Sequence, residues 1–215
     1  MQIFSQVFWL PKAGNSIDEY EDAFWYQPSQ IENGRCFEFA VADGATETSF
    51  SGLWATMLVN AFGYGYTTKS SIINVLPEIQ KQWFEEVSVK PLPWYAEEKL
   101  RKGAFSSFLG LSINNNDSVI DTFIKWESIA IGDSCLFQVR DDNVLVCFPL
   151  KNSEEFNNRP LLLSSNIDNN IDLNKELMIL NGLCKQDDSF YMMTDALACW
   201  FLQSYEIGKA SCRER

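Results

Sequence analysis

The middle of the chain carries four apolar segments in a row, each separated from the next by a short polar turn. The turns at 114–117, 132–133 and 141–143 consist mainly of Asn, Asp and Gly, which favour tight reversals of the chain. Short connections of this kind join antiparallel neighbours. The pattern therefore predicts antiparallel sheet over most of this region. The expected strands are residues 104–113, 119–131, 134–140 and 143–149.

Segments with helical spacing lie on both sides of this region. We expect helices over 51–62 and 71–87, with Pro77 as an interruption or restart of the second, and a third or continuing helix over 94–102. A last helix is expected over 196–205. Further strands are expected at residues 2–9, after Glu21–Asp22, and at 37–42, 176–180 and 188–194, with a loop or small insertion at 151–174. Separate runs of strands and helices predict an α+β domain in which helices cover antiparallel sheets.

The charge and the absence of histidine restrict the chemistry. The 215 residues carry a net charge of −12, so a nucleic-acid partner is not expected. The acidity fits either a soluble, self-repelling surface or a cation site built from carboxylates. Without histidine, a Ser-His-Asp triad and a His-ligated zinc site are excluded. A hydrolytic metal site would use oxygen ligands, which suit magnesium, manganese or calcium.

The cysteines and the termini give weaker expectations about location. None of the six cysteines forms a CxxC pair, which excludes a zinc ribbon or a thioredoxin-type motif. The start of the chain is a poor signal peptide, and no stretch approaches the roughly 20 apolar residues of a membrane span. We therefore expect a cytoplasmic protein without a membrane partner.

Three aspartates stand where apolar strands stop. Asp43 follows FAVA, Asp133 follows SIAIG, and Asp195 follows FYMMT, while Glu21–Asp22 precede an early strand. Strand ends are rigid and emerge at one rim of a sheet, so carboxylates there can converge on a common site. The alternative is that these are ordinary turn residues, because Asp is common in turns.

The motifs around these acidic residues resemble those of the type 2C family of metal-dependent protein phosphatases. They are YEDAF (20–24), FAVADGA (39–45), GAFSSFLGLSI (103–113), AIGDSCLFQVRDD (130–142) and DSFYMMTDALACWFL (188–202). The resemblance covers about residues 12–205 and points to a divergent bacterial-type branch. It implies a four-layer αββα sandwich of two antiparallel sheets flanked by helices. It also implies hydrolysis of phosphoserine and phosphothreonine in proteins, with two or three Mn²⁺ or Mg²⁺ ions as cofactors.

The same resemblance assigns roles to individual residues. Asp43 would bridge two metals and Asp195 would bind one of them, and both, with Asp22, form the expected catalytic set. Ser106 or Ser107 stands where the family often has Thr beside the metals. The implied metal ligands are Glu21, Asp22, Asp43, the backbone carbonyl of Gly44, Asp133 and Asp195.

The chain also departs from the family pattern. Ile17 occupies the position where the family commonly has an Arg that grips the phosphate, and Lys12 and Arg35 are candidate substitutes. Asp195 is followed by Ala196 rather than Gly, and no Asp-Asn pair follows it. We assign residues 1–207 to a phosphatase-like domain, truncated at its C-terminal end on this interpretation, and residues 208–215 to a polar tail foreign to it.

Three functional hypotheses follow. The first is an active Mn²⁺- or Mg²⁺-dependent phosphatase for phosphorylated protein substrates. The second is a catalytically weak or inactive relative that serves as a regulatory or binding module, as Ile17 and the missing Asp-Asn pair suggest. The third is an unrelated α+β binding domain. The separation of the Asp43 and Asp195 carboxylates distinguishes the third hypothesis from the first.

Overall fold

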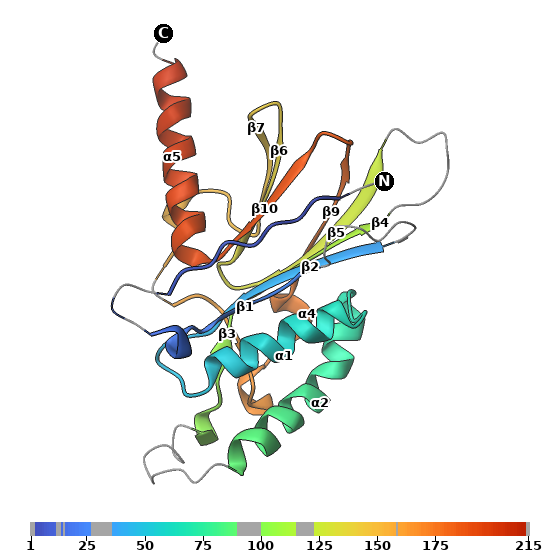
Figure 1. Cartoon of the computed structure of the whole chain (residues 1–215), viewed down its shortest axis with the longest axis vertical. Coiled ribbons are helices and arrows are strands. Elements are labelled where there is room, and N and C mark those ends of the chain that lie inside the picture. The colour runs from blue at the N-terminus through green and yellow to red at the C-terminus, as the bar shows by residue number, and fades with distance from the viewer. Residues whose placement is uncertain are drawn as a thin grey trace.

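Two antiparallel sheets stack between two layers of helix (Figure 1). The computed structural model describes residues 3–11, 14, 16–26, 36–89, 100–114, 123–157 and 159–213. Among these residues, no helix is both long enough and apolar enough to cross a membrane. The α+β class and the antiparallel sheets expected from the strand and helix patterns are confirmed.

The larger sheet has five strands in the order β1-β2-β4-β5-β9. Every neighbouring pair in it is antiparallel. Strand β1 therefore forms one edge of this sheet and β9 the other. The strands are β1 (Asp22–Trp25), β2 (Cys36–Asp43), β4 (Phe108–Asn114), β5 (Ile124–Ile131) and β9 (Met178–Cys184).

The smaller sheet has three strands in the order β10-β6-β7, also antiparallel. A short two-stranded ladder of β3 and β8 lies apart from both sheets. The strands of these two units are β10 (Ser189–Met193), β6 (Cys135–Arg140), β7 (Asn143–Phe148), β3 (Phe105–Ser106) and β8 (Leu163–Ser164).

Helices α1 and α2 cover the outer face of the five-stranded sheet, and α5 covers the three-stranded sheet (Figure 1). The helices are α1 (Ser51–Gly63), α2 (Lys69–Ser88), α4 (Leu173–Glu176) and α5 (Asp195–Arg213). Short 3-10 turns occur at η1 (Ile17–Glu19), η2 (Ser153–Glu155) and η3 (Ile167–Asn169). The side chains of Trp54, Phe62 and Trp83 fill the layer beneath α1 and α2.

The two sheets face each other across an apolar layer. Leu111 and Trp126 of the larger sheet and Leu136 of the smaller one are buried in this layer. Phe190 packs against it, with its ring 5.6 Å from that of Trp126. On the far side of the smaller sheet, Phe137 packs against Phe201 of α5 at 4.5 Å between ring centroids. The layers thus follow the expected αββα order.

The structure corrects several expectations. The described residues 3–11 form no strand, and Phe4 and Phe8 are largely exposed, so the alternation in this segment does not bury an apolar face. The turn at 132–133 does not close a hairpin, because β5 and β6 belong to different sheets. Helix α2 continues through Pro77 without interruption.

Two further regions differ from the expectation in part. The stretch 151–174 is not one loop, because it contains η2, β8, η3 and the start of α4. Of the helix expected over 94–102, residues 100–102 are helical and the rest lies outside the described residues.

Candidate functional site

Asp22 and Asp43 lie opposite each other at one end of the β1–β2 pair. The antiparallel register makes them direct partners, at the start of β1 and the end of β2. Glu21 precedes Asp22, and its backbone carbonyl accepts a hydrogen bond from the Gly44 N–H at 3.2 Å. A β-carbon on Gly44 would lie 2.9 Å from that carbonyl oxygen, so only glycine permits this approach. The backbones of Glu21, Asp22 and Asp43 thus meet at one strand end.

The Glu21 carboxylate is held by the first residue of α1. The Ser51 hydroxyl donates a hydrogen bond to Glu21 Oε1 at 2.7 Å. This contact fixes the position of the carboxylate relative to the sheet. Because Ser51 is buried, the contact also excludes water from one side of Glu21.

Two buried serines hold the backbone of Asp43. The Ser106 hydroxyl donates to the Asp43 carbonyl oxygen at 2.9 Å, and the Ser107 N–H donates to the same oxygen at 2.9 Å. In return, the Asp43 N–H donates to Ser107 Oγ at 3.2 Å. The end of β2 is therefore fixed by three hydrogen bonds from the chain preceding β4.

The turn that carries Asp133 is joined to the same serines. The hydroxyl oxygens of Ser107 and Ser134 lie 2.6 Å apart. Burial, and then the negative charge of Asp195, raise the pKa of Asp133 to about 6. Asp133 and Asp195 are therefore close enough to repel each other. They form a second pair of acidic residues, one in the connection between β5 and β6 and the other at the start of α5.

Asp195 is the first residue of α5 rather than the last residue of a strand, because β10 ends at Met193. Its side chain accepts a hydrogen bond from the Ala196 N–H. A carboxylate at a helix N-terminus is stabilised by the unpaired N–H groups and the helix dipole. The structure thus places Asp195 at a helix start. Its carboxylate is exposed, and its charge contributes to the raised pKa of Asp133.

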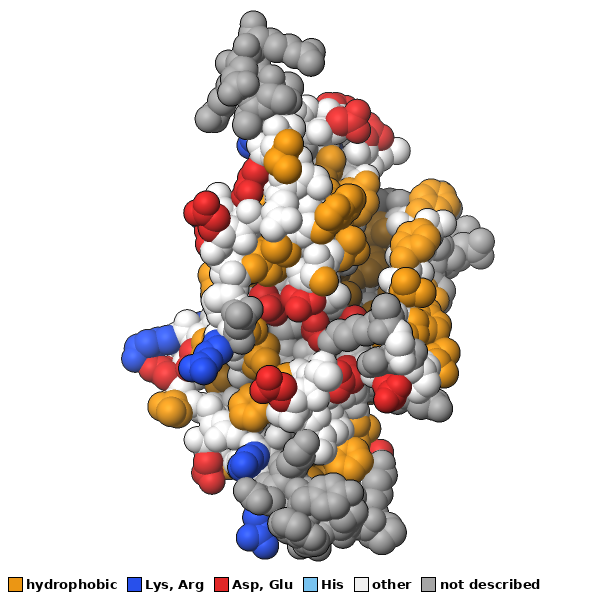
Figure 2. All heavy atoms as spheres, turned by 90° about the vertical axis from the view of Figure 1, so that its left-hand side faces the viewer, with side chains coloured by type: hydrophobic (Ala, Val, Ile, Leu, Met, Phe, Trp, Pro, Cys, Tyr) orange, Lys and Arg blue, Asp and Glu red, His pale blue; other side chains and the backbone are white. Residues whose placement is uncertain are grey.

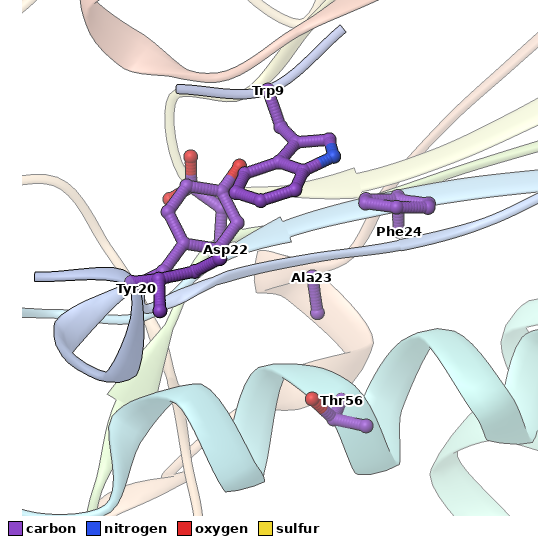
Figure 3. Close-up of a pocket in the computed structure, with 7 residues that line it drawn as sticks. Trp9, Tyr20, Asp22, Ala23, Phe24 and Thr56 are labelled. Carbon is purple, nitrogen blue, oxygen red and sulfur yellow. The ribbon is translucent and has the colours of Figure 1, made fainter. Parts of the chain in front are cut away.

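An aromatic pair lies beside the first acidic group. The ring of Trp9 packs on that of Tyr20 at 5.4 Å between centroids (Figure 3). Burial raises the pKa of Tyr20, and so do the charge of Asp22, a hydrogen bond to Asp22 and the charge of Asp43. Both residues belong to an open cavity of about 340 Å³. Its lining residues are Trp9, Ile17, Tyr20, Asp22, Ala23, Phe24 and Thr56.

The acidic residues gather as two groups rather than as one compact cluster. Within the part of the chain that the structure describes, no three Asp, Glu or Cys side chains lie together as a ready metal site. Figure 2 shows several Asp and Glu side chains near the middle of one face of the molecule. The serine pair Ser107–Ser134 connects the backbone of the first group to the turn of the second.

The oxygen-only donor set fits Mg²⁺ or Mn²⁺, because hard cations prefer carboxylate and carbonyl oxygens. The raised pKa of Asp133 fits the same interpretation, since a nearby cation would offset the repulsion from Asp195. Ile17 is 62% exposed and supplies no charge to a phosphate group. The two candidate substitutes for the phosphate-gripping Arg, Lys12 and Arg35, lie outside the described residues.

Sequence patterns did not reveal several residues of this region. Trp9 lies in the segment expected as a strand and Tyr20 in the YEDAF motif, but neither pattern predicts that the two rings pack together. Ser51 and Ser134 are common helix-start and turn residues. Their contacts join segments distant in the chain, such as the 30 positions between Glu21 and Ser51. No local sequence pattern predicts contacts of this kind.

Comparison with solved structures finds similar folds at low sequence identity. The X-ray structure of the photosystem II phosphatase PBCP is 15% identical, over 80% of this chain and 58% of that one, with a TM-score of 0.45. The catalytic domain of the serine threonine protein phosphatase PstP, in complex with two manganese ions, is 12% identical. The match covers 89% of this chain and 74% of that one, with a TM-score of 0.47. The fold is similar to that of solved protein phosphatases.

A third structure, RsbX in complex with magnesium, is 14% identical over 89% of this chain and 77% of that one, with a TM-score of 0.49. No family model matches the sequence, and no curated protein matches it either. The chain spans 58% of the PBCP structure. Likeness at this level concerns the fold alone.

Proposed function

We propose that the protein hydrolyses phosphoserine and phosphothreonine in protein substrates with the help of two divalent cations, Mn²⁺ or Mg²⁺. The observation that carries the proposal is the pairing of Asp22 with Asp43 at one strand end, with Glu21 adjacent. Asp22 and Asp43 are direct register partners, and carboxylates brought together in this way are typical ligands of a divalent cation.

The proposed ligands come from both groups of acidic residues. Glu21, Asp22, Asp43 and the Gly44 carbonyl would hold cations at the larger sheet. Asp195 and Asp133 would complete the site from the smaller sheet and α5, with Asp133 at a third, weaker position. When bound, the cations would activate a water molecule and neutralise charge on the phosphoryl group.

The remaining residues of the site orient these ligands. Ser51 holds the Glu21 carboxylate, and Ser107 fixes the backbone of Asp43. The Tyr20 side chain lies beside Asp22, whose charge and hydrogen bond raise the pKa of Tyr20. Such supporting contacts keep ligands within the narrow range of geometry that a metal site requires.

The proposal is tested with p-nitrophenyl phosphate and Mn²⁺. We expect Asp43→Asn to lower the Mn²⁺-dependent rate at least about 100-fold, because it removes a charged ligand from the site. The matched control is Asp142→Asn, which makes the same change at an exposed turn residue whose φ of 60° Asn tolerates. Equal rates for the wild type and Asp43→Asn would refute the proposal.

A second candidate is a phosphoprotein-binding module without catalysis. Ile17 in place of a phosphate-gripping Arg favours it, and so does the division of the acidic residues into two groups. Calorimetric titration with Mn²⁺ separates the two candidates. Binding at two sites with micromolar affinity supports the enzyme, and absence of Mn²⁺ binding supports the module.

A further inference from the structure

The cavity beside Asp22 is lined mainly by apolar side chains, and several of these are exposed to solvent. The exposed fractions are 47% for Trp9, 62% for Ile17 and 36% for Phe24. Figure 3 shows the Phe24 ring on the same side of β1 as the Trp9–Tyr20 pair. Exposed apolar surface that lines a concave site is typical of ligand binding.

Two hydroxyl groups in the lining are already engaged within the protein. The Tyr20 hydroxyl bonds to Asp22, and the Thr56 hydroxyl donates to the Gly52 carbonyl at 2.7 Å. A ligand would therefore meet mainly the faces of the rings and the aliphatic Ile17. An apolar side chain matches this surface, because its burial against the rings and Ile17 removes apolar area from water on both sides.

The cavity also lies along the edge of a sheet. Tyr20, Asp22, Ala23 and Phe24 lead into or belong to β1, which pairs with β2 on one side and is the edge strand of the five-stranded sheet. Edge strands bind extended peptides by adding them as a further strand, while pockets beside the edge take alternate side chains. An edge strand and an apolar pocket together indicate a peptide as the occupant.

We propose that this cavity binds an apolar side chain, such as Leu or Phe, next to the phosphorylated residue of an extended peptide substrate. The inference rests on the proposed function, because the cavity and the proposed metal site share Asp22. A peptide running along β1 would then present its phosphoryl group near Asp22 and Asp43 and its neighbouring apolar residue between Trp9 and Phe24.

The test uses phosphothreonine peptides that are identical except for Leu or Ala at the positions flanking the phosphorylated residue. We expect kcat/KM to be about tenfold higher for the Leu peptide, as partial burial of the larger side chain predicts. Ile17→Asn and Trp9→Ala should each bring this ratio close to one. The matched control Phe8→Ala should keep the ratio, because Phe8 is a neighbouring aromatic residue that is 88% exposed and lies outside the cavity.

Further measurements separate this proposal from the proposed function. Hydrolysis of p-nitrophenyl phosphate reports on the metal site alone, since it carries no peptide. Activity on p-nitrophenyl phosphate with equal kcat/KM for the two peptides overturns the cavity proposal and leaves the phosphatase intact. If the protein is inactive, fluorescence anisotropy of labelled peptides with Mn²⁺ provides the test. Tighter binding of the Leu peptide that Ile17→Asn removes supports the cavity, and equal binding overturns it.

The same variants test whether a second copy of the chain occupies the cavity instead. Sedimentation of the wild type as a dimer, and of Ile17→Asn as a monomer, would assign the cavity to self-association and overturn the proposal. A monomeric wild type with a preference for the Leu peptide is the expected result. Ile17→Asn is informative here because an exposed substitution leaves folding largely unaffected.

Discussion

The hydroxyl oxygen of Ser107 lies 2.6 Å from that of Ser134, and both side chains are buried. Ser107 also bonds to both backbone groups of Asp43, whereas Ser134 follows the turn that carries Asp133. The pair therefore joins the end of β2 to the start of β6, which belong to different sheets. It directly links the backbone of Asp43 to the turn that carries Asp133.

Loss of this link should destabilise the fold. Ser134→Ala leaves the Ser107 hydroxyl without one of its buried partners, and we expect a loss of about 1–3 kcal/mol in the free energy of unfolding, measured by urea denaturation. Ser112→Ala is the matched control, because Ser112 Oγ is buried without a hydrogen-bond partner among the described residues. That variant should be neutral or slightly stabilising. A Ser134→Ala protein as stable as wild type would show that the serine pair contributes nothing.

A buried ion pair should give the stability a specific pH dependence. The side chain of Asp188 is 1% exposed and bonds to Arg140 and Gln138. Burial alone raises the pKa of Asp188, but hydrogen bonds from Arg140, the Lys185 N–H and Gln138 outweigh it and lower the pKa below its ordinary value. The resulting stabilisation is present above the ordinary pKa of about 3.9 and is lost as the pH falls through the lower folded-state value.

Asp188→Asn should therefore destabilise the protein at pH 7 by about 2–3 kcal/mol, less than for a fully buried pair because Arg140 is 27% exposed. The difference from wild type should shrink as the pH falls below about 4, where the carboxylate of the unfolded chain becomes protonated, and should vanish below the lower folded-state pKa. Urea denaturation of both proteins at several pH values measures this difference in the free energy of unfolding. Asp172→Asn, at an exposed ion pair with Lys175, should show a small and nearly constant difference. A pH-independent loss for Asp188→Asn would contradict this account.

Close packing of an aromatic ring on a strand should make Gly110 irreplaceable. A β-carbon on Gly110, in the middle of β4, would lie 2.4 Å from the Phe62 ring. Gly110→Ala should lower the free energy of unfolding by about 1–3 kcal/mol through overpacking. Gly208→Ala in α5 is the control, because no described atom outside the helix's own backbone lies within 4 Å of the added carbon. That change should stabilise the protein by about 0.5–1 kcal/mol, and thermal denaturation of both variants checks the opposite signs.

The uninterrupted path of α2 through Pro77 leads to a prediction of increased stability. Proline lacks the N–H that would bond to the Ile73 carbonyl one turn earlier. Pro77→Ala should raise the free energy of unfolding by about 1–3 kcal/mol, as seen by urea denaturation. Glu78→Ala, at an exposed neighbouring position, should change it by less than about 0.5 kcal/mol. A destabilised Pro77→Ala protein would show that the ring contributes packing that alanine cannot replace.

Local patterns predicted most of the secondary structure. Apolar runs bounded by turn residues predicted β2, β6 and β7 to within one residue at each end. The strand expected over 104–113 is divided into β3 and β4, and the one expected over 119–131 is observed from Ile124. The prediction of a strand at residues 2–9 was wrong, because alternation of apolar residues alone does not supply a partner strand. The change of sheet between β5 and β6 was also missed, since a Gly-Asp turn looks the same within a hairpin and between layers.

The candidate site was predictable only where its residues end strands. Asp43 stands at such an end, and its pairing with Asp22 follows from the register of β1 and β2. The role of each acidic residue as a metal ligand stays a prediction. The contacts of Tyr20 and Ser51 depend on segments brought together by the fold, and no pattern of neighbouring residues encodes them.

Asp133 lies in the short connection from β5 of the larger sheet to β6 of the smaller one, where the chain passes from one sheet to the other. The strands on either side of this connection are anchored in the apolar layer between the sheets by the buried side chains of Ala130 and Leu136. A change of volume in that layer would therefore shift the backbone that carries Asp133 without touching its carboxylate. The placement of one acidic residue of the proposed site thus depends on interior side chains that have no polar group of their own.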